Sequence, residues 1–226
     1  MNRNYSVLKK LKYVLPISKN KYQFVRKLKA GALVLDVGCG NYSPERLKIA
    51  NPTIRYIGID VGDYCNDTTS LANADSYIVC RPEIFSDTIH NLPEQFDGVI
   101  STQNLEHCNN PIKTLDAMCE RLACNGQLFL TFPSERSAHF PSRKGTLCFY
   151  DDATHQWLPQ YDDIIARLKQ NRLTIVFARR QYHPPFLFLL GLLLEPLSRL
   201  LHTVFPGTWA LWGFESVIWA KREQGG

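Results

Sequence analysis

The sequence predicts a doubly wound α/β fold, in which a mostly parallel sheet is covered by helices on both faces. Two observations support this prediction. From about residue 30 onward, short apolar runs alternate with amphipathic segments, which is the order of strands and helices in a parallel sheet. The composition, with 45% hydrophobic and 21% charged residues in 226, is typical of one folded globular domain. We therefore expect a single domain over residues 1–226.

Seven strands are expected, each a short apolar run bounded by turn residues. Residues 32–37 lie between Gly31 and Gly38 and have the continuous apolar character of a buried central strand. The other expected strands are residues 54–60, 76–80, 96–101, 127–132, 173–178 and 215–220.

Helix signals fill the gaps between these strands. Ser43 is expected as an N-cap residue, followed by a first-turn proline and an early acid. Pro82 begins a second expected helix, and Pro159 begins another. After Asn110 and Pro111, one apolar stripe is expected on the helix of residues 112–122, which Asn125 and Gly126 terminate. The apolar positions expected on one face are Ile84, Phe85 and Ile89 in the second helix, and Ile112, Leu115, Met118, Cys119 and Leu122 in the last.

Charge is distributed unevenly along the chain. Residues 1–35 contain nine Lys and Arg residues and no acid, although the whole chain has a net charge of only +5. A basic helical segment over residues 1–30 is expected, and its charge suits an anionic partner such as phosphate headgroups, nucleic acid or a phosphorylated substrate. A solvated surface helix is the alternative interpretation.

The seven cysteines indicate free thiols. They form no C-x-x-C pair and show no zinc spacing, so neither a disulfide framework nor a structural metal is expected. The segment after Met1 lacks the apolar run of a secretory signal. We expect a cytoplasmic location.

The segment of residues 183–211 is an apolar insertion between the last two expected strands. Its longest uninterrupted apolar run, residues 186–194, is too short to span a membrane, which takes about 20 residues. It could lie at a membrane interface, receive a lipid-linked substrate, contact a second subunit or pack on the core. The basic N-terminus favours peripheral membrane contact through residues 184–205, which would place the protein at the inner face of the membrane.

The most informative segment is LVLDVGCG, residues 33–40. Asp36 lies within a strand, and Gly38 and Gly40 follow at the carboxyl end, where open α/β sheets bind ligands. A nicotinamide fingerprint would need a third glycine at Ser43, which weakens that reading. Asp60 ends the second strand, where its carboxylate can accept hydrogen bonds from both hydroxyls of a ribose.

Residues 33–40, 57–60, 96–111 and 122–133 together resemble class I S-adenosylmethionine-dependent methyltransferases. The resemblance covers about residues 22–133 and includes the LEH turn after strand four. It implies a seven-stranded sheet with an antiparallel C-terminal strand and S-adenosylmethionine as cofactor. It implies that Asp36 faces the methionyl ammonium directly or through water, that Gly38 and Gly40 line the methionyl tail and that Asp60 holds the ribose. Ser101, Thr102 and Gln103 are expected at the sulfonium and the methyl group, and Cys39 and Val61 are also expected to bind the cofactor.

Two alternatives exist for the residues at the adenine end of the cofactor. Cys80 and Arg81 at the end of the third strand are expected to contact adenine through their backbone. Asp87 is the alternative, but the helix expected from Pro82 would place it more than a turn away.

Two histidines are candidate general bases for a hydroxyl acceptor. His107 lies in the LEH turn and has a suitable intrinsic pKa, although a structural role for Glu106 and His107 in closing the turn is an equal alternative. His155 follows Asp151, Asp152 and Thr154 in a polar loop. That loop could contact substrate, remain solvated or bind a divalent cation, and no metal is assigned.

The resemblance implies methyl transfer to a small-molecule, sugar or lipid-linked acceptor, at a hydroxyl. The polar loop and the apolar insertion resemble those of methyltransferases of bacterial surface-polysaccharide pathways. A quinone or lipid methyltransferase and a non-catalytic cofactor-binding protein are the alternatives. No nucleic-acid partner is expected, because STQNLEH follows Ile100 in place of an N/D-P-P-Y/F motif. The oligomeric state is left open.

Overall fold

The computed structural model describes residues 18–64 and 66–223. Most of the expected basic segment of residues 1–30 therefore lies outside the described residues. Its described part contains α2 (Lys21–Arg26), a short helix whose N-cap residue Asn20 accepts a hydrogen bond from the backbone N–H of Gln23. Its buried residues, Phe24 and Val25 among them, pack on one face of the sheet.

Seven strands form one sheet in the order β3-β2-β1-β4-β5-β7-β6. All neighbours are parallel except β7, which is antiparallel to both β5 and β6. This confirms the predicted fold class, including the reversed C-terminal strand. The strands are β1 (Leu33–Val37), β2 (Arg55–Asp60), β3 (Ser76–Val79), β4 (Phe96–Thr102), β5 (Leu122–Pro133), β6 (Leu173–Arg179) and β7 (Glu215–Arg222).

The strand order sets the place of a ligand site. From β1 the chain builds outward to β2 and β3, and it then returns to the other side of β1 with β4 and β5. Open α/β sheets bind ligands in the crevice at the carboxyl ends of the strands where this reversal occurs. In this sheet the crevice lies beyond the ends of β1 and β4, whose register pairs Val37 with Ser101.

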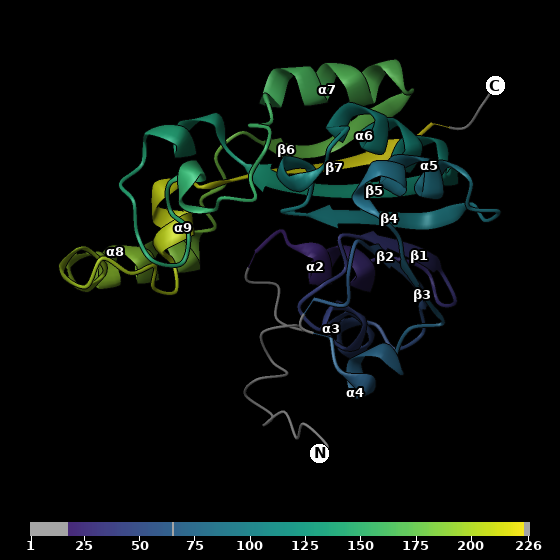
Figure 1. Cartoon of the computed structure of the whole chain (residues 1–226), viewed down its shortest axis with the longest axis horizontal. Coiled ribbons are helices and arrows are strands. Elements are labelled where there is room, and N and C mark those ends of the chain that lie inside the picture. Colours follow the sequence, from purple (N-terminus) through teal and green to yellow (C-terminus); the bar gives the residue numbers. More distant parts are fainter. Residues whose placement is uncertain (1–17, 65, 224–226) are drawn as a thin grey trace.

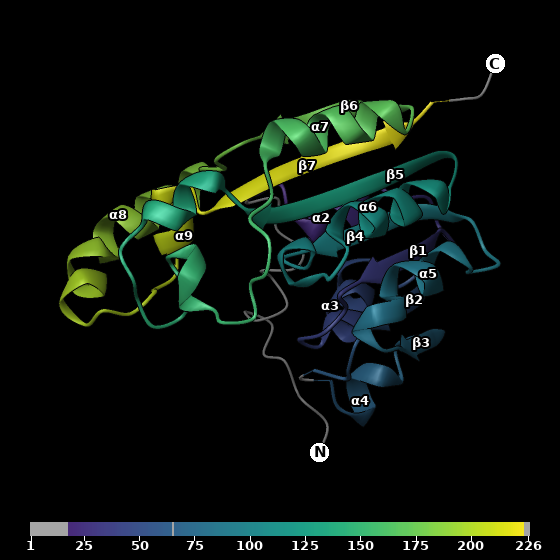
Figure 2. The same ribbon diagram turned by 45° about the horizontal axis from the view of Figure 1, so that its top comes forward.

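Helices cover both faces of the sheet (Figures 1 and 2). They bury two apolar clusters. One cluster lies between the sheet and α5 (Phe85–His90), α6 (Pro111–Glu120) and α7 (Tyr161–Gln170), and includes Phe85, Met118 and Leu168. The other lies between the sheet and α2 and α3 (Ser43–Ala50). The remaining helices are α4 (Thr68–Leu71), α8 (Pro185–Leu200) and α9 (Thr208–Trp212), with 3₁₀ turns η1 (Pro82–Ile84), η2 (Leu105–His107), η3 (Glu135–His139) and η4 (Phe149–Asp151).

Several local predictions need correction. Tyr42, in the left-handed conformation, caps α3 in place of Ser43, because the Ser43 hydroxyl bonds to Asp36 instead. The helix after Pro111 ends at Glu120, and Leu122 already begins β5, which runs through Asn125 as a long strand. Ile84 and Ile112 are exposed, because each lies in the first turn of its helical segment, at the rim of the core.

The predicted apolar insertion forms α8 and α9 between β6 and β7. Because β6 runs parallel to β4 and β5, this connection leaves the sheet at the edge where the crevice lies, and Figure 1 shows α8 and α9 on the side toward which β4 and β5 point. The two helices contact each other closely at Gly191 and Gly207, where an added Cβ on Gly191 would lie 2.2 Å from the Gly207 carbonyl oxygen. Among the described residues, no helix has the length and apolarity to cross a membrane.

Candidate cofactor and acceptor site

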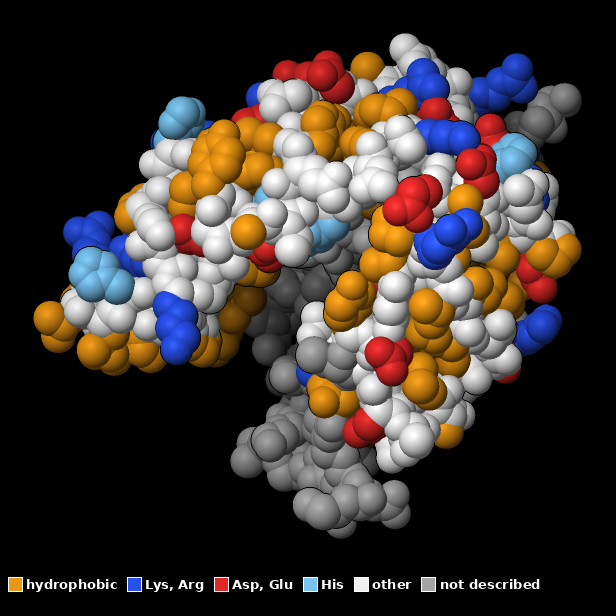
Figure 3. All heavy atoms as spheres, viewed as in Figure 1, with side chains coloured by type: hydrophobic (Ala, Val, Ile, Leu, Met, Phe, Trp, Pro, Cys, Tyr) orange, Lys and Arg blue, Asp and Glu red, His pale blue; other side chains and the backbone are white. Residues whose placement is uncertain are grey.

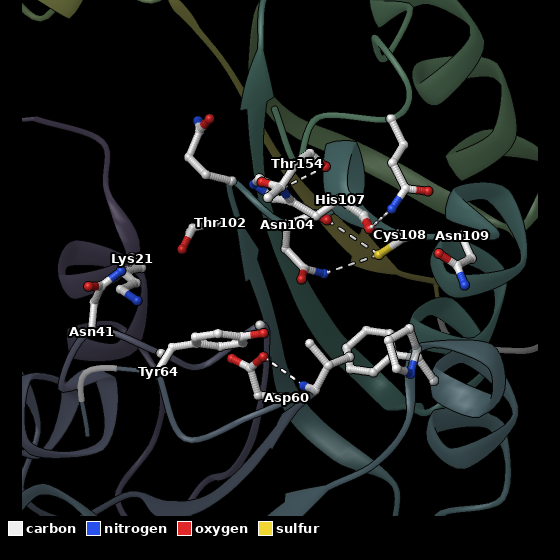
Figure 4. A pocket seen from close by; sticks show the side chains of 17 residues that line it. Lys21, Asn41, Asp60, Tyr64, Thr102, Asn104, His107, Cys108, Asn109 and Thr154 are labelled. Carbon is white, nitrogen blue, oxygen red and sulfur yellow. Dashed lines mark hydrogen bonds between the residues drawn. The ribbon is translucent and has the colours of Figure 1, made fainter. Parts of the chain in front are cut away.

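A cavity of about 510 Å³ lies at the carboxyl ends of β1, β2 and β4 (Figure 4). The loops after these strands supply most of its walls, and α2, the segment after β3 and the loop before α7 complete it. Its lining residues are Lys21, Gly38, Gly40, Asn41, Asp60, Val61, Tyr64, Pro82, Phe85, Thr102, Gln103, Asn104, His107, Cys108, Asn109, Thr154 and Gln156.

The two glycines after β1 let the backbone form one wall of this cavity. Gly38 has φ of +75°, and its N–H donates to the Ile59 carbonyl oxygen at 2.9 Å. A Cβ at Gly38 would lie 2.4 Å from the side-chain oxygen of Asn104, so both the backbone angle and the packing require glycine. At Gly40, a Cβ would lie 3.1 Å from the Tyr64 carbonyl oxygen.

Asp60 ends β2 and points into the cavity opposite His107 (Figure 4). Its Oδ1 accepts the backbone N–H of Val61 at 2.7 Å. Burial raises the pKa of this carboxyl to about 6, against the opposing effect of backbone N–H groups. The position suits a carboxylate that accepts hydrogen bonds from ribose hydroxyls, as the sequence predicts.

Asp36 is fully buried and does not line the cavity. Its Oδ2 accepts hydrogen bonds from the hydroxyls of Ser43 and Tyr56, and burial keeps the Tyr56 pKa well above its ordinary value, so the phenol remains a donor. The Lys21 ammonium, which lines the cavity, donates to the Ser43 hydroxyl oxygen at 2.7 Å. Asp36 is therefore connected to the cavity wall by hydrogen bonds through Ser43 and Lys21.

The other carboxylate oxygen of Asp36, Oδ1, is buried and accepts no hydrogen bond from the described residues. A buried carboxylate oxygen without a donor is costly, and such an atom near a ligand cavity suits a water-mediated contact with an ammonium group.

The predicted adenine contacts lie beside the cavity rather than in it. Neither Cys80 nor Arg81 lines the cavity, whereas Pro82 and Phe85 do. Cys80 packs against the core cluster next to α5. The chain turns at Pro82, so that Pro82 and Phe85, rather than Cys80 and Arg81, reach the cavity wall. The alternative, Asp87, pairs with Lys113 at 2.7 Å, away from the cavity.

The end of β4 contributes two of its three predicted residues. Thr102 and Gln103 line the cavity, and Gln103 has φ of +49° and donates to Glu215 Oε1 at 3.1 Å. Ser101 is buried and accepts a hydrogen bond from the Asn104 side chain at 3.3 Å. Cys39, also predicted, is buried and does not line the cavity.

His107 lines the cavity from η2 and is held by the loop before α7. Its Nδ1 lies 2.9 Å from the Thr154 hydroxyl oxygen, and that hydroxyl donates to Asp152 Oδ1 at 2.6 Å. Because the Thr154 proton goes to Asp152, its oxygen must accept from Nδ1–H of His107. This chain of hydrogen bonds leaves Nε2 of His107 as the proton-accepting nitrogen. Burial, and then the nearby His155, lower the His107 pKa, so the ring is neutral at pH 7.

His155 lies behind His107 and does not line the cavity. The two rings are 4.8 Å apart between centroids, and Nδ1–H of His155 donates to the Phe149 carbonyl oxygen at 2.6 Å. Glu106 is fully buried beside them, and neither carboxyl oxygen has a hydrogen-bond partner on another described residue. Burial raises the Glu106 pKa to about 8.

Glu106, His107 and His155 also form the one group of described residues with the ligand spacing of a metal site. One ligand atom from each lies within 4.8 Å of the others. From the sequence, a cation site among Asp151, Asp152 and His155 is one of three interpretations of this polar loop. In the structure, Asp151 instead accepts the backbone N–H groups of Arg143, Leu147 and Cys148 and closes its own loop.

Sequence reasoning missed several lining residues that reach the cavity from separate elements. Tyr64 and Asn41 follow expected strand ends, so their position in loops at the carboxyl edge was a usable signal. Asn104 and Cys108 flank the LEH turn that the sequence already marked. Lys21 comes from the helix before β1, and nothing in the sequence pattern connects it with this edge.

Comparison with known proteins decides the family. The family model described as "Methyltransferase domain" matches residues 8–176, which is most of the chain. The chain belongs to this methyltransferase family. Its fold is that of solved S-adenosylmethionine-dependent methyltransferases. The glycine wall, the Asp60 carboxylate and the unpartnered Asp36 oxygen are consistent with this cofactor.

The methyltransferase is similar in sequence to ubiquinone biosynthesis O-methyltransferases of Pseudomonas. The protein from Pseudomonas syringae pv. tomato is 31% identical over 105 residues, which are 45% of this chain and 44% of the relative. A protein of the same description from Pseudomonas putida strain F1 is also 31% identical, with the same coverage. The chain therefore matches less than half the length of these relatives.

Solved structures show the same fold at low sequence identity. An S-adenosylmethionine-dependent methyltransferase from Mesorhizobium loti has a TM-score of 0.58 at 13% identity, covering 89% of this chain and 96% of its own. Magnesium protoporphyrin IX methyltransferase from Synechocystis PCC 6803, solved with bound S-adenosylmethionine, has a TM-score of 0.50 at 15% identity, with coverage of 86% and 71%.

Proposed function

We propose that this methyltransferase transfers the methyl group to a hydroxyl of a small-molecule, sugar or lipid-linked acceptor, and that His107 takes up the hydroxyl proton. The observation that carries the proposal is the hydrogen-bond chain from His107 through Thr154 to Asp152. It orients the ring, leaves Nε2 as the free acceptor and places a carboxylate where it stabilises the protonated ring.

S-adenosylmethionine, when bound, supplies a methyl group already activated by a positively charged sulfur. The protein's part is to position the two reactants, because an in-line displacement depends on alignment. We assign Asp60 and Val61 to the ribose, Gly38 and Gly40 to the methionyl tail, and Thr102 and Gln103 to the end of the cavity nearest His107. Asp36 acts through Ser43 and Lys21, and its Oδ1 is the acceptor for an ammonium or its bound water.

Pro82 and Phe85 are the residues we assign to the adenine ring. They are the apolar members of the cavity wall next to β3, and a flat aromatic ring gains from burial against such surfaces. This assignment replaces the backbone contacts expected of Cys80 and Arg81. His155 becomes a positioning residue that packs on His107, rather than a second base.

A quinone or other lipophilic phenol is the second candidate acceptor. Two features favour it, namely the similarity to ubiquinone biosynthesis O-methyltransferases and the exposed leucines of α8.

A role in surface-polysaccharide synthesis stays a prediction, as does the absence of a nucleic-acid partner. A cytoplasmic location is supported by the free state of the six described cysteines.

The test is methyl transfer from labelled S-adenosylmethionine in the presence of a cell extract separated into aqueous and lipid fractions. We expect label in a product whose new methyl ether resists mild base. Label on a nitrogen or carbon atom would contradict the hydroxyl assignment. Binding of the cofactor without label in either fraction would support the non-catalytic alternative.

A further inference from the structure

Helix α8 has the reverse of the usual distribution of side chains. Its buried residues are Gly191, Glu195 and Ser198, two of which are polar. Apart from Arg199, its exposed residues are apolar, and six of them recur at helical spacings of three and four, so they form one stripe, here called the leucine stripe. Leu193 and Leu200 are 77% and 76% exposed. The stripe consists of Phe186, Leu189, Leu192, Leu193, Leu197 and Leu200.

A buried ion pair fixes α8 in this orientation. The Arg143 guanidinium donates to both oxygens of Glu195, at 2.9 and 2.7 Å, and to the Ser198 hydroxyl at 2.6 Å. Hydrogen bonds from Arg143 lower the Glu195 pKa to about 2, so the carboxylate stays charged. Rotating the helix to hide its leucines would expose or break this pair, and breaking a buried pair is costly. The leucines face outward because the polar face is anchored inward.

Positive charge borders the leucine stripe. The Arg199 side chain is 68% exposed next to Leu192 on the helix surface, and Lys144 is exposed beside the end of α8, where its N–H donates to the His202 carbonyl oxygen. Within Pro185–Leu200, which the structure describes completely, Glu195 is the sole acid and it is paired. Figure 3 shows hydrophobic side chains gathered along the edge formed by α8, with Lys and Arg side chains next to them.

A second cavity, of about 570 Å³, opens along one flank of the leucine stripe. Arg136, His139 and Arg199 line it, together with Leu192 of the stripe and Trp212 of α9. The carboxylate in its wall, Glu195, is already neutralised by Arg143 and Arg199. An anionic group held there would therefore lie directly beside an apolar surface, which is the geometry of a phospholipid headgroup next to its chains.

We propose that α8 docks the protein on an anionic lipid bilayer, with the leucine stripe in the headgroup region and a lipid phosphate in the second cavity. An apolar helix face bordered by Lys and Arg is the pattern of helices that lie in the membrane interface. A protein partner fits less well, because strongly binding protein interfaces rely on Trp, Tyr and Arg, and leucine is under-represented among their key residues.

The docked orientation has a consequence for the acceptor. Helix α8 leaves the sheet at the same edge as the cofactor cavity, so a bilayer under α8 would face that edge. The acceptor class is then a molecule resident in the membrane, a lipophilic phenol or a lipid-linked sugar. This last step rests on the proposed function, whereas the docking itself does not.

The test is co-sedimentation of the purified full chain with vesicles of phosphatidylcholine alone or mixed with phosphatidylglycerol, at low and high salt. We expect binding to both, stronger to the anionic vesicles, and weakened but not abolished by salt, because salt screens only the charges. Leu193→Asp combined with Leu200→Asp should reduce binding about tenfold or more. Arg136→Gln and Lys144→Gln should each reduce binding to anionic vesicles about fivefold and leave binding to phosphatidylcholine unchanged.

Val176→Asp is the matched control, because Val176 is 58% exposed on β6, outside α8. It should bind vesicles as the wild type does. Retained affinity for S-adenosylmethionine in every variant shows that each is folded, and a failed transfer assay would leave the sedimentation result standing. Protein that stays in the supernatant with all vesicles would overturn the proposal, as would vesicle binding that the double leucine variant retains. Lipid-free self-association that the same variant abolishes would assign the leucine stripe to a second copy of this chain.

Discussion

At the scale of single residues, Asp60 joins cofactor affinity to pH. A hydrogen bond to a charged group contributes about 1.5 to 3 kcal/mol to the free energy of binding. Asp60→Ala should therefore weaken S-adenosylmethionine binding about ten- to a hundredfold. Calorimetric titration measures this loss. Unchanged affinity in the variant would contradict the ribose assignment.

The raised pKa of Asp60 adds a pH dependence to the same binding. Because the carboxyl of the free protein titrates at a pKa of about 6, protonation below that pH removes an acceptor, and affinity should fall as pH drops from 7 to 5. Asp60→Asn should bind more weakly at pH 7 and lose most of this pH dependence. A wild-type affinity that is flat across the range would contradict the account.

The raised pKa of Glu106 predicts a pH dependence of the free energy of unfolding. Its folded pKa of about 8 lies above the ordinary 4.5, so between these values the unfolded chain has released this proton and the folded chain has not. Unfolding therefore becomes more favourable as pH rises through this window, by up to about 1.4 kcal/mol per pH unit. The groups facing Glu106 are His107, His155, Asp152 and Glu215.

Glu106→Gln should remove that pH-dependent loss. The free energy of unfolding from urea titrations, compared at pH 6 and pH 8, should fall less for the variant than for the wild type. Equal slopes for the two proteins would show that Glu106 is not the buried acid responsible.

Removing metal ions by chelation distinguishes two interpretations of Glu106, His107 and His155, a general base at His107 or a cation site. If His107 acts as a base, transfer activity should be unchanged after dialysis against EDTA, because the ring needs only its hydrogen bond to Thr154. Loss of activity on chelation, with recovery on adding Mg²⁺ or Zn²⁺, would assign these side chains to a cation instead.

At the scale of elements, the Arg143–Glu195 pair holds α8 and α9 to the rest of the molecule. Arg143→Met leaves Glu195 with only the exposed Arg199 and the Trp212 indole as partners, and should lower the free energy of unfolding by about 3 to 5 kcal/mol. Urea unfolding measures the loss. Arg143→Met combined with Glu195→Leu should recover much of it, and a double variant as unstable as the single one would contradict this view of the pair.

The strands show why the elements were largely predictable and where prediction failed. Strands buried on both faces appear as apolar runs, and β1, β2 and β4 were expected within two residues of their ends. Helix α4 (Thr68–Leu71) was missed, because four residues held by the Asp67 cap leave no periodic pattern. Strand β5 starts early, because backbone pairing with Phe96 carries Leu122 into the sheet before the Asn125 turn signal.

At the scale of the whole molecule, the site was predictable only where strand ends supply it. Gly38, Asp60 and Thr102 follow from the rule that ligands bind at the carboxyl edge. The contact from Thr154 to His107 joins residues 47 positions apart, and Lys21 enters from the helix before β1. These depend on how loops pack, which no local pattern encodes. Asp36 was placed in the right strand, but its side chain bonds to Ser43 and Tyr56 beneath the cavity.

The fold also explains how one edge of the sheet can serve two surfaces. The connections after β1, β2 and β4 supply most of the cofactor cavity, and the connection from β6 to β7 forms α8 and α9, which lie on the side toward which β4 and β5 point (Figure 1).

The most direct test of the central claim is the single-turnover rate of methyl transfer in His107→Gln, measured with the acceptor-containing fraction and saturating S-adenosylmethionine. Loss of a positioned base should lower this rate about 10²- to 10⁴-fold, while cofactor affinity changes little. Asp152→Asn, which weakens the chain that orients the ring, should lower it less. A His107→Gln variant that transfers the methyl group at the wild-type rate would contradict the claim that this histidine accepts the proton.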